Sequence, residues 1–252
     1  MGAFVYSLFA YTIFLVTFLY SIAFVENLPV PRSIDRAPGG ALAISIVIDL
    51  ALLSLFAVQH SVMARASFKR AWTRIVPPVA ERSTYVAASS LALIVLFVFW
   101  RALPAPVWSV PEGPLAVTLR VISYLGFAIV LVSTFLIDHF ELFGVRQGWA
   151  RLKGESLPAP RFRTPLFYRL VRHPLYFGFV LAFWSAPRMS AGHLLFALAT
   201  TGYMLVAIGL EERDLIATFG EAYVVYRQRV SMIIPLPPRR GPPPASPIAR
   251  ES

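Results

Sequence analysis

The sequence contains no cysteine, and this absence excludes disulfide bonds, a cysteine nucleophile and cysteine-ligated metals. Any thiol chemistry must therefore use a thiol that a substrate supplies. Charged residues are also scarce, at 14% of the 252 residues, where a soluble domain carries about a quarter. Hydrophobic residues make up 57% of the chain. This composition indicates a protein whose solvent is lipid.

Nucleotide-binding and metal-binding motifs are absent as well. No Gly-x-Gly-x-x-Gly follows a strand pattern, which excludes a Rossmann domain. No His-x-x-His or carboxylate set has metal-ligand spacing, and the adjacent Asp138 and His139 diverge on a helix, so we expect no metal. The net charge of +10 does not predict a nucleic-acid partner, because the basic residues fall in particular loops, as a membrane topology produces.

Long apolar runs are the main feature that is present. Four of them cover residues 3–25, 41–63, 84–103 and 115–137. Each is long enough to cross the ~30 Å hydrocarbon core as a helix. The first run lacks the basic start and the cleavage site of a signal peptide, so we interpret it as a permanent span.

A further apolar block, residues 174–210, is interrupted at Pro187-Arg188. It predicts a helical hairpin of two full spans, or of one full and one partial span. The predicted fold is therefore all-α: a polytopic membrane bundle of five to six transmembrane helices. We expect a single domain over residues 1–235, with a cofactor region at about 165–235. The proline- and arginine-rich tail, residues 236–252, is predicted to be disordered.

The charges of the loops predict an orientation. The loop 64–83 carries five basic residues against one acidic, and the segment 138–172 carries seven against three. The loops 26–40 and 101–114 are balanced. This alternation follows the positive-inside rule. It places the N-terminus, both basic segments and the C-terminal tail in the cytoplasm of a bacterial-type inner membrane.

Two polar clusters flank the predicted hairpin. Arg172 and His173 precede a proline that suits the first position of a helix, and Tyr176 lies in the first turn. Glu211 and Glu212 follow the second arm. A hairpin begins and ends on one side of the membrane, so these residues should meet at the cytoplasmic face. Ionisable groups at such depth are costly and usually functional.

The residues after Gly220, which should end the second arm, predict a short interfacial helix with Tyr223, Tyr226 and Arg227 on one face. An alternative interpretation treats the arginines as topology anchors and the two glutamates as solvated residues at a helix end. His60 ends the second span, where a single interfacial histidine is more often structural than catalytic. Asp49 lies within that span and needs a partner.

The spacing of these motifs resembles a known superfamily. Arg-His-Pro-x-Tyr, Glu-Glu-Arg-Asp-Leu and Phe-Gly-x-x-Tyr-x-x-Tyr, within the last ~70 residues, are similar to the isoprenylcysteine carboxyl methyltransferases and phospholipid methyltransferases. Upstream, the segments 56–65, 81–85 and 138–144 resemble the methanethiol S-methyltransferase branch, which is grouped with nurim-like membrane proteins. This similarity extends over nearly the whole chain.

The resemblance implies methyl transfer from S-adenosylmethionine, as co-substrate, to methanethiol, giving dimethyl sulfide. On this view Arg172 and the helix start at His173 hold the carboxylate, and Glu211 and Glu212 take the ammonium or the ribose hydroxyls. The predicted tyrosine contacts to adenine or the sulfonium are Tyr176, Tyr223 and Tyr226. The candidates for a general base are His173 and His60.

Two alternatives stay open at the level of sequence. One is a related membrane methyltransferase that acts on a lipid or an isoprenylcysteine-type substrate. The other is a non-enzymatic nurim-like membrane protein, which would not bind the cofactor. The segments before residue 145 favour the small thiol. The sequence does not give the oligomeric state or the path by which the substrate enters.

Overall fold

A computed structural model describes residues 1–158 and 161–237. Within these residues, five helices are long and apolar enough to cross a membrane. They are α1 (Gly2–Val25), α2 (Leu42–Ala64), α4 (Pro78–Phe99), α5 (Pro114–Ile137) and α9 (Ala191–Phe219). The chain is therefore a multi-pass membrane protein with an all-α fold, as predicted. From residue 238 on, the tail predicted to be disordered lies outside the described residues.

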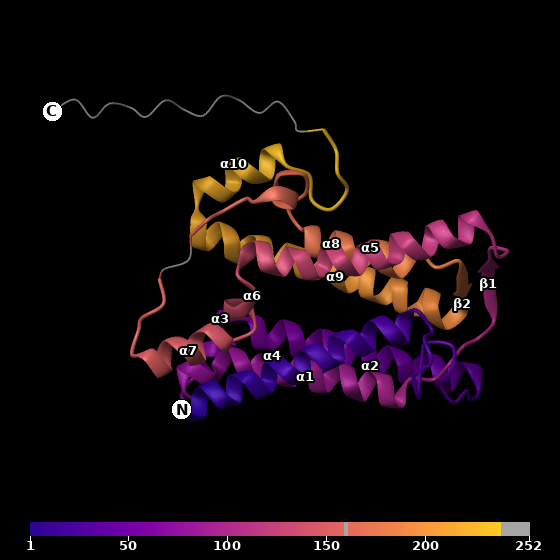
Figure 1. Ribbon diagram of the computed structural model, residues 1–252, viewed down its shortest axis with the longest axis horizontal. Helices are drawn as coiled ribbons and strands as arrows, with labels where there is room; N and C mark the ends of the chain where they lie inside the picture. The colour runs from indigo at the N-terminus through magenta and orange to yellow at the C-terminus, as the bar shows by residue number, and fades with distance from the viewer. Residues whose placement is uncertain (159–160, 238–252) are drawn as a thin grey trace.

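The interrupted apolar block forms one partial and one full span. Helix α8 (Pro174–Trp184) has 11 residues, so it is about 16 Å long and too short to cross the ~30 Å core. Helix α9 has 29 residues and is long and apolar enough to cross it. Between them the strand β2 (Arg188–Ser190) pairs antiparallel with β1 (Pro106–Ser109), which lies between α4 and α5. This small ribbon closes one end of the bundle (Figure 1).

Short helices gather at the opposite end. These are α3 (Ala66–Trp72), α6 (His139–Leu142), α7 (Val145–Lys153) and α10 (Glu221–Arg229), with a 3-10 turn at Leu166–Arg169. The N-terminus, α3 and α7 lie together at this end (Figure 1). The two loops predicted to be cytoplasmic therefore share one end, and the two balanced loops share the other.

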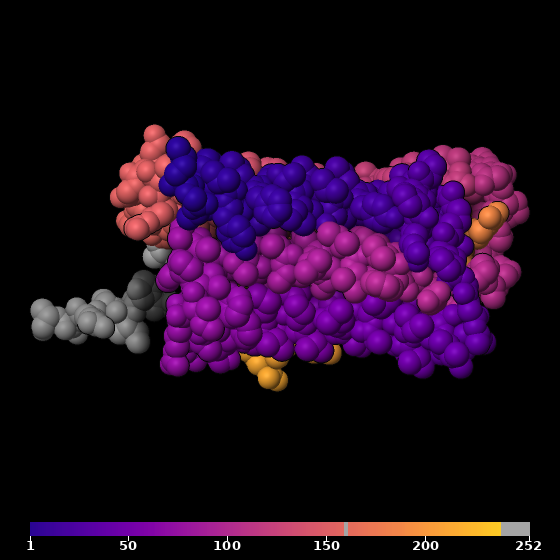
Figure 2. Space-filling view, turned by 90° about the horizontal axis from the view of Figure 1, so that it is seen from below, coloured from indigo at the N-terminus to yellow at the C-terminus, as the bar shows by residue number. Residues whose placement is uncertain are grey.

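The helices form two layers, one of α1, α2 and α4 and one of α5, α8 and α9 (Figure 1). The first layer presents a continuous outer face (Figure 2). An aromatic core joins the layers toward the ribbon end, where Phe24, Trp100 and Phe196 are buried and in ring contact. The indole N–H of Trp100 donates to the Ile34 carbonyl at 3.0 Å. Packing is thus tight near the ribbon and leaves a cavity toward the other end.

Helix α8 is held against α5 by a close backbone approach. A Cβ placed on Gly126 would lie 2.5 Å from the carbonyl oxygen of Gly178, and one on Gly178 would lie 2.6 Å from that of Gly126. Small residues at such crossings let membrane helices pack closely without a hydrophobic driving force. This contact sets the position of α8, whose first residues carry the candidate site.

Candidate functional site

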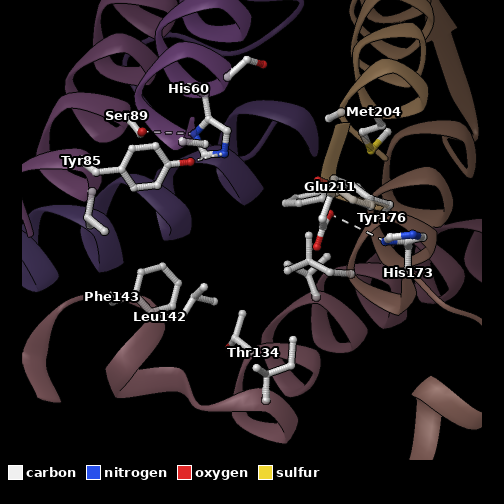
Figure 3. Close-up of a pocket in the computed structure, with 18 of the residues that line it drawn as sticks. His60, Tyr85, Ser89, Thr134, Leu142, Phe143, His173, Tyr176, Met204 and Glu211 are labelled. Carbon is white, nitrogen blue, oxygen red and sulfur yellow. Dashed lines mark hydrogen bonds and ion pairs between the residues drawn. The ribbon is translucent and has the colours of Figure 1, made fainter. Parts of the chain in front are cut away.

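A cavity of about 1060 Å³ lies between the two helix layers. Seven of the eight predicted site residues line it, and these are His60, Arg172, His173, Tyr176, Glu211, Tyr223 and Tyr226. Glu212 is a direct partner of two of them. His60 comes from one layer, while Tyr176, His173 and Glu211 come from the other (Figure 3). The structure thus brings together groups that are more than 100 positions apart in the sequence.

Glu212 forms the centre of an ion-pair network. Its Oε1 accepts from Arg172 Nε at 2.7 Å and lies 3.2 Å from His173 Nε2. Its Oε2 lies 3.7 Å from Arg227 Nη1. The side chains of Arg172 and Glu212 are only 11% and 10% exposed. Glu212 therefore has its oxygens occupied within the protein.

Arg172 belongs to the same network through two of its three guanidinium nitrogens. Besides its bond to Glu212, its Nη1 donates to the carbonyls of Arg227 at 3.1 Å and Val230 at 2.5 Å. Its backbone N–H donates to the Ser231 carbonyl at 2.8 Å. The guanidinium consequently ties the segment before α8 to the end of α10. Its observed contacts are those of a residue that builds the site wall.

Glu211 is placed differently from its neighbour. Its side chain is 45% exposed, and its Oε2 lies 3.7 Å from His173 Nδ1. It lies beside Tyr176 at the cavity (Figure 3). His173 thus contacts both glutamates through its two ring nitrogens while being only 4% exposed itself. Of the two adjacent carboxylates, Glu211 is the one available to a ligand.

The start of α8 has the expected form. His173 is the N-cap residue, Pro174 follows at the first helical position, and no side chain caps the end. The backbone N–H of Phe177 is the first to bond within the helix, to the carbonyl of His173. A helix start of this kind attracts anionic groups.

Helix α10 carries two tyrosines that face the cavity. Gly220, with φ of 57°, ends α9 as predicted and turns the chain into α10. Tyr226 Oη donates to the Tyr168 carbonyl at 2.5 Å, whereas Tyr223 Oη is buried with no hydrogen-bond partner among the described residues. Burial raises the pKa of Tyr226 to about 12. It also raises the pKa of Tyr223, so both phenols stay protonated donors at neutral pH.

His60 has partners on the opposite wall. Its Nε2 lies 2.8 Å from Tyr85 Oη and its Nδ1 lies 3.1 Å from Ser89 Oγ, as Figure 3 shows. Phe56 stacks on the imidazole, with ring centroids 5.1 Å apart. Of these three residues, the sequence predicts only His60 as a site residue. Tyr85 and Ser89 are four residues apart on α4 and therefore share one face of the helix. This spacing is the sequence feature from which the two residues could have been predicted to act together.

The remaining polar residues of interest lie elsewhere. Asp49 is buried near the ribbon end and accepts from the backbone N–H of Arg101 at 2.9 Å, which ties α2 to the end of α4. Asp138 pairs with Arg146 and caps the backbone N–H of Glu141 at 3.1 Å. Among the described residues no group of His, Asp and Glu is arranged to hold a metal.

The length of α9 indicates how far Glu211 lies from the ribbon end of the bundle. Glu211 comes 20 residues after Ala191, the first residue of the helix, so it lies about 30 Å along the axis. This length matches the thickness of the hydrocarbon core. A span that begins at Ala191 would therefore place Glu211 at the membrane boundary opposite the ribbon.

Comparison with known proteins supplies the family. The chain is 54% identical over 233 residues to methanethiol S-methyltransferase 1 of Bradyrhizobium diazoefficiens, covering 92% of this chain and 82% of that protein. It is 51% identical over 235 residues to the methanethiol S-methyltransferase of Mycobacterium tuberculosis, covering 93% and 96%.

The chain belongs to the methanethiol S-methyltransferase family. The predicted membership is thereby confirmed, and with it the prediction of a methyltransferase, an enzyme class that needs a methyl donor. Nurim of Rattus norvegicus is a more distant relative, 37% identical over 184 residues that cover 68% of each protein. No family model matches the chain, and no solved structure matches it.

Proposed function

We propose that the protein transfers the methyl group of S-adenosylmethionine to methanethiol, producing dimethyl sulfide and S-adenosylhomocysteine. The observation that carries this proposal is the cavity between the layers, in which the available carboxylate of Glu211, on α9, lies beside His173 at the start of α8, in a chain of this family. The volume of about 1060 Å³ is slightly above the range for small-molecule sites, about 300–1,000 Å³. It leaves room for the donor and a small thiol together.

The residues present fit S-adenosylmethionine, which supplies an electrophilic methyl group on a sulfonium. Glu211 would pair with the ammonium of the donor, and the start of α8 behind His173 would receive its carboxylate. Tyr223 has a buried hydroxyl that lacks a partner among the described residues and suits a ribose or adenine contact. The face of Tyr176 would stabilise the sulfonium charge.

The network around Glu212 would act by holding these groups in place. Arg172 is bonded through Nε and Nη1 and both Glu212 oxygens have partners, so we assign this pair to positioning His173 and α10. His173 would orient Glu211 through Nδ1. Methyl transfer depends chiefly on alignment of the reacting centres, and a rigid ion-pair network supplies it.

The site would be reached from the cytoplasm. The end of the bundle that carries Glu211 and Tyr223 also carries the basic segments 64–83 and 138–172. A soluble donor made in the cytoplasm would enter there, while a small apolar thiol also partitions into the surrounding lipid. We assign this activity to one membrane domain, residues 1–235, with the donor region at about 165–235.

Expression in a bacterial host that lacks the activity tests the proposal. Cells fed methanethiol should release dimethyl sulfide, measured in the headspace by gas chromatography, and Glu211→Gln should release far less. The matched control is Glu221→Gln, an exposed glutamate outside the cavity, which should behave as the parent. Absence of dimethyl sulfide from membrane-inserted parent protein that still binds S-adenosylmethionine would rule out methanethiol as substrate.

A further inference from the structure

The chain contains two histidines with nearly the same surroundings. His60 lies between Tyr85 at Nε2, 2.8 Å, and Ser89 at Nδ1, 3.1 Å. His139 lies between Tyr11 at Nε2, 2.9 Å, and Thr134 at Nδ1, 2.7 Å. Each ring also stacks on a phenylalanine. We call these sets the His60 triple and the His139 triple.

The two triples differ in what they face. All three members of the His60 triple line the cavity, and the ring of Tyr85 is directed at His60 across the cavity wall (Figure 3). Of the His139 triple only Thr134 is among the cavity residues, and His139 is buried between α1, α5 and α6. The same arrangement therefore serves packing in one place and is open to a ligand in the other.

The hydrogen bonds of the His60 triple allow a proton to move from the Tyr85 hydroxyl to His60. A neutral imidazole has one donor and one acceptor nitrogen. Ser89 Oγ can accept from Nδ1–H, which leaves Nε2 to accept from the hydroxyl of Tyr85. The charged and titratable groups that face this part of the cavity are Arg65, Lys69, Arg82, Tyr176, Tyr203, Glu211 and Asp214. Among them, Arg82 has its guanidinium carbon 6.0 Å from the Tyr85 ring centroid.

Methylation of an alkyl thiol needs a group that accepts the thiol proton. The thiolate is the nucleophile, and a thiol with an ordinary pKa is mostly protonated at neutral pH. The donor groups lie on α8, α9 and α10, and the His60 triple lies on the opposite wall formed by α2 and α4. A thiol held between the walls would have its sulfur next to the methyl donor and its hydrogen next to Tyr85.

We propose that Tyr85 removes the thiol proton and passes its own proton to His60, which Ser89 holds in the accepting tautomer. The S–H bond breaks, and the sulfur electron pair forms the new S–C bond as the methyl carbon leaves the sulfonium. The proton rests on His60 Nε2 and is then released to water. This inference rests on the proposed function and adds the residue that handles the proton.

The test compares Tyr85→Phe with the parent enzyme over a range of pH, with saturating S-adenosylmethionine and purified protein. For methanethiol, kcat of the variant should fall by about 10²-fold at pH 7, with an unchanged KM for the donor. The variant rate should then rise about tenfold per pH unit, because only thiolate already present can react. Methaneselenol, which is ionised at neutral pH, should be methylated by both proteins at similar rates.

The matched control is Tyr11→Phe, which removes the equivalent hydroxyl from the His139 triple and should leave the pH profile as it is in the parent. A Tyr85→Phe variant with the parent's pH profile, or with equal losses for methanethiol and methaneselenol, would overturn the relay and leave Tyr85 a packing residue. A parent enzyme that methylates neither compound would instead refute the proposed function. Near-parental thermal stability of Tyr85→Phe excludes misfolding as the cause of a loss.

Discussion

At the scale of single residues, the two adjacent glutamates have different environments. Glu212 is 10% exposed and contacts Arg172, His173 and Arg227, whereas Glu211 is 45% exposed and faces the cavity. Removing one partner of a buried ion pair leaves the other charge uncompensated and is strongly destabilising. The neighbours should therefore respond to the same substitution in different ways.

Glu212→Gln should lower the free energy of unfolding by about 3 kcal/mol, because Arg172 loses its buried counter-ion. Thermal unfolding of the detergent-solubilised protein measures this. Glu211→Gln should keep the parent's melting temperature and raise KM for S-adenosylmethionine. Equal melting temperatures for the two variants would contradict the difference in role.

Tyr223 gives a second prediction at this scale. Its buried hydroxyl has no hydrogen-bond partner among the described residues, so Tyr223→Phe removes an unsatisfied group and should leave the ligand-free protein as stable as the parent or slightly more so. If the hydroxyl bonds the donor, its loss should weaken S-adenosylmethionine binding about tenfold. Calorimetric titration measures the affinity, and an unchanged value would show that the donor does not use Tyr223.

The site residues differ in how far the sequence predicts them. The sequence predicts that Arg172, His173 and Glu211 lie together, because they flank a helical hairpin and a hairpin begins and ends on the same side of the membrane. It does not predict the contact of Tyr85 and Ser89 with His60, 25 and 29 positions away, since this contact depends on α4 packing against α2. The different environments of Glu211 and Glu212 could not be predicted from the sequence either, because they depend on the direction in which each side chain points from α9.

At the scale of elements, apolar length predicts the spans well and their ends less well. The runs 3–25 and 115–137 became Gly2–Val25 and Pro114–Ile137. The run 84–103 differs from α4 at both ends, because the helix already begins at Pro78, before the charged pair Glu81 and Arg82, and stops at Phe99. Polar residues can extend a helix beyond the lipid, so the end of an apolar run does not predict the end of the helix.

The crossing of α5 and α8 should tolerate no added carbon. In Gly126→Ala the new Cβ would lie 2.5 Å from the Gly178 carbonyl oxygen and 2.6 Å from the Ala182 nitrogen, which are backbone atoms that cannot rotate away. Overpacking of this kind costs about 1–3 kcal/mol, and displacement of α8 should also reduce methyl transfer. Unfolding and activity measured on one preparation test both effects.

The control for that crossing is Gly209→Ala on α9, where an added Cβ meets nothing within 4 Å. This variant should be as stable as the parent or gain up to about 1 kcal/mol from helix propensity. A loss at Gly209 equal to that at Gly126 would mean that glycine matters here for flexibility and not for close packing.

At the scale of the whole molecule, the division into two ends is the feature that joins fold and function. The α4–α5 connection pairs with the α8–α9 turn through the β1–β2 ribbon, so both lie at one end. The short helices α3, α7 and α10 are at the other (Figure 1), together with the cavity residues Arg65, Glu211 and Tyr223. Loop charge predicted this grouping of loops, since membrane insertion acts on the same charges. It did not predict the cavity, which depends on how the two layers pack.

The absence of cysteine makes the orientation directly testable. Glu112, near the ribbon, and Glu155, after α7, are both exposed, so Glu112→Cys and Glu155→Cys each place one thiol in a chain that has no other. With the ribbon outside, a membrane-impermeant maleimide should label Glu112→Cys in spheroplasts and should label Glu155→Cys only after the membrane is opened. The parent should not be labelled in either case. The reverse pattern would put Glu211 and Tyr223 on the outer side, away from the cytoplasmic supply of S-adenosylmethionine, and would contradict both the orientation and the route proposed for the donor.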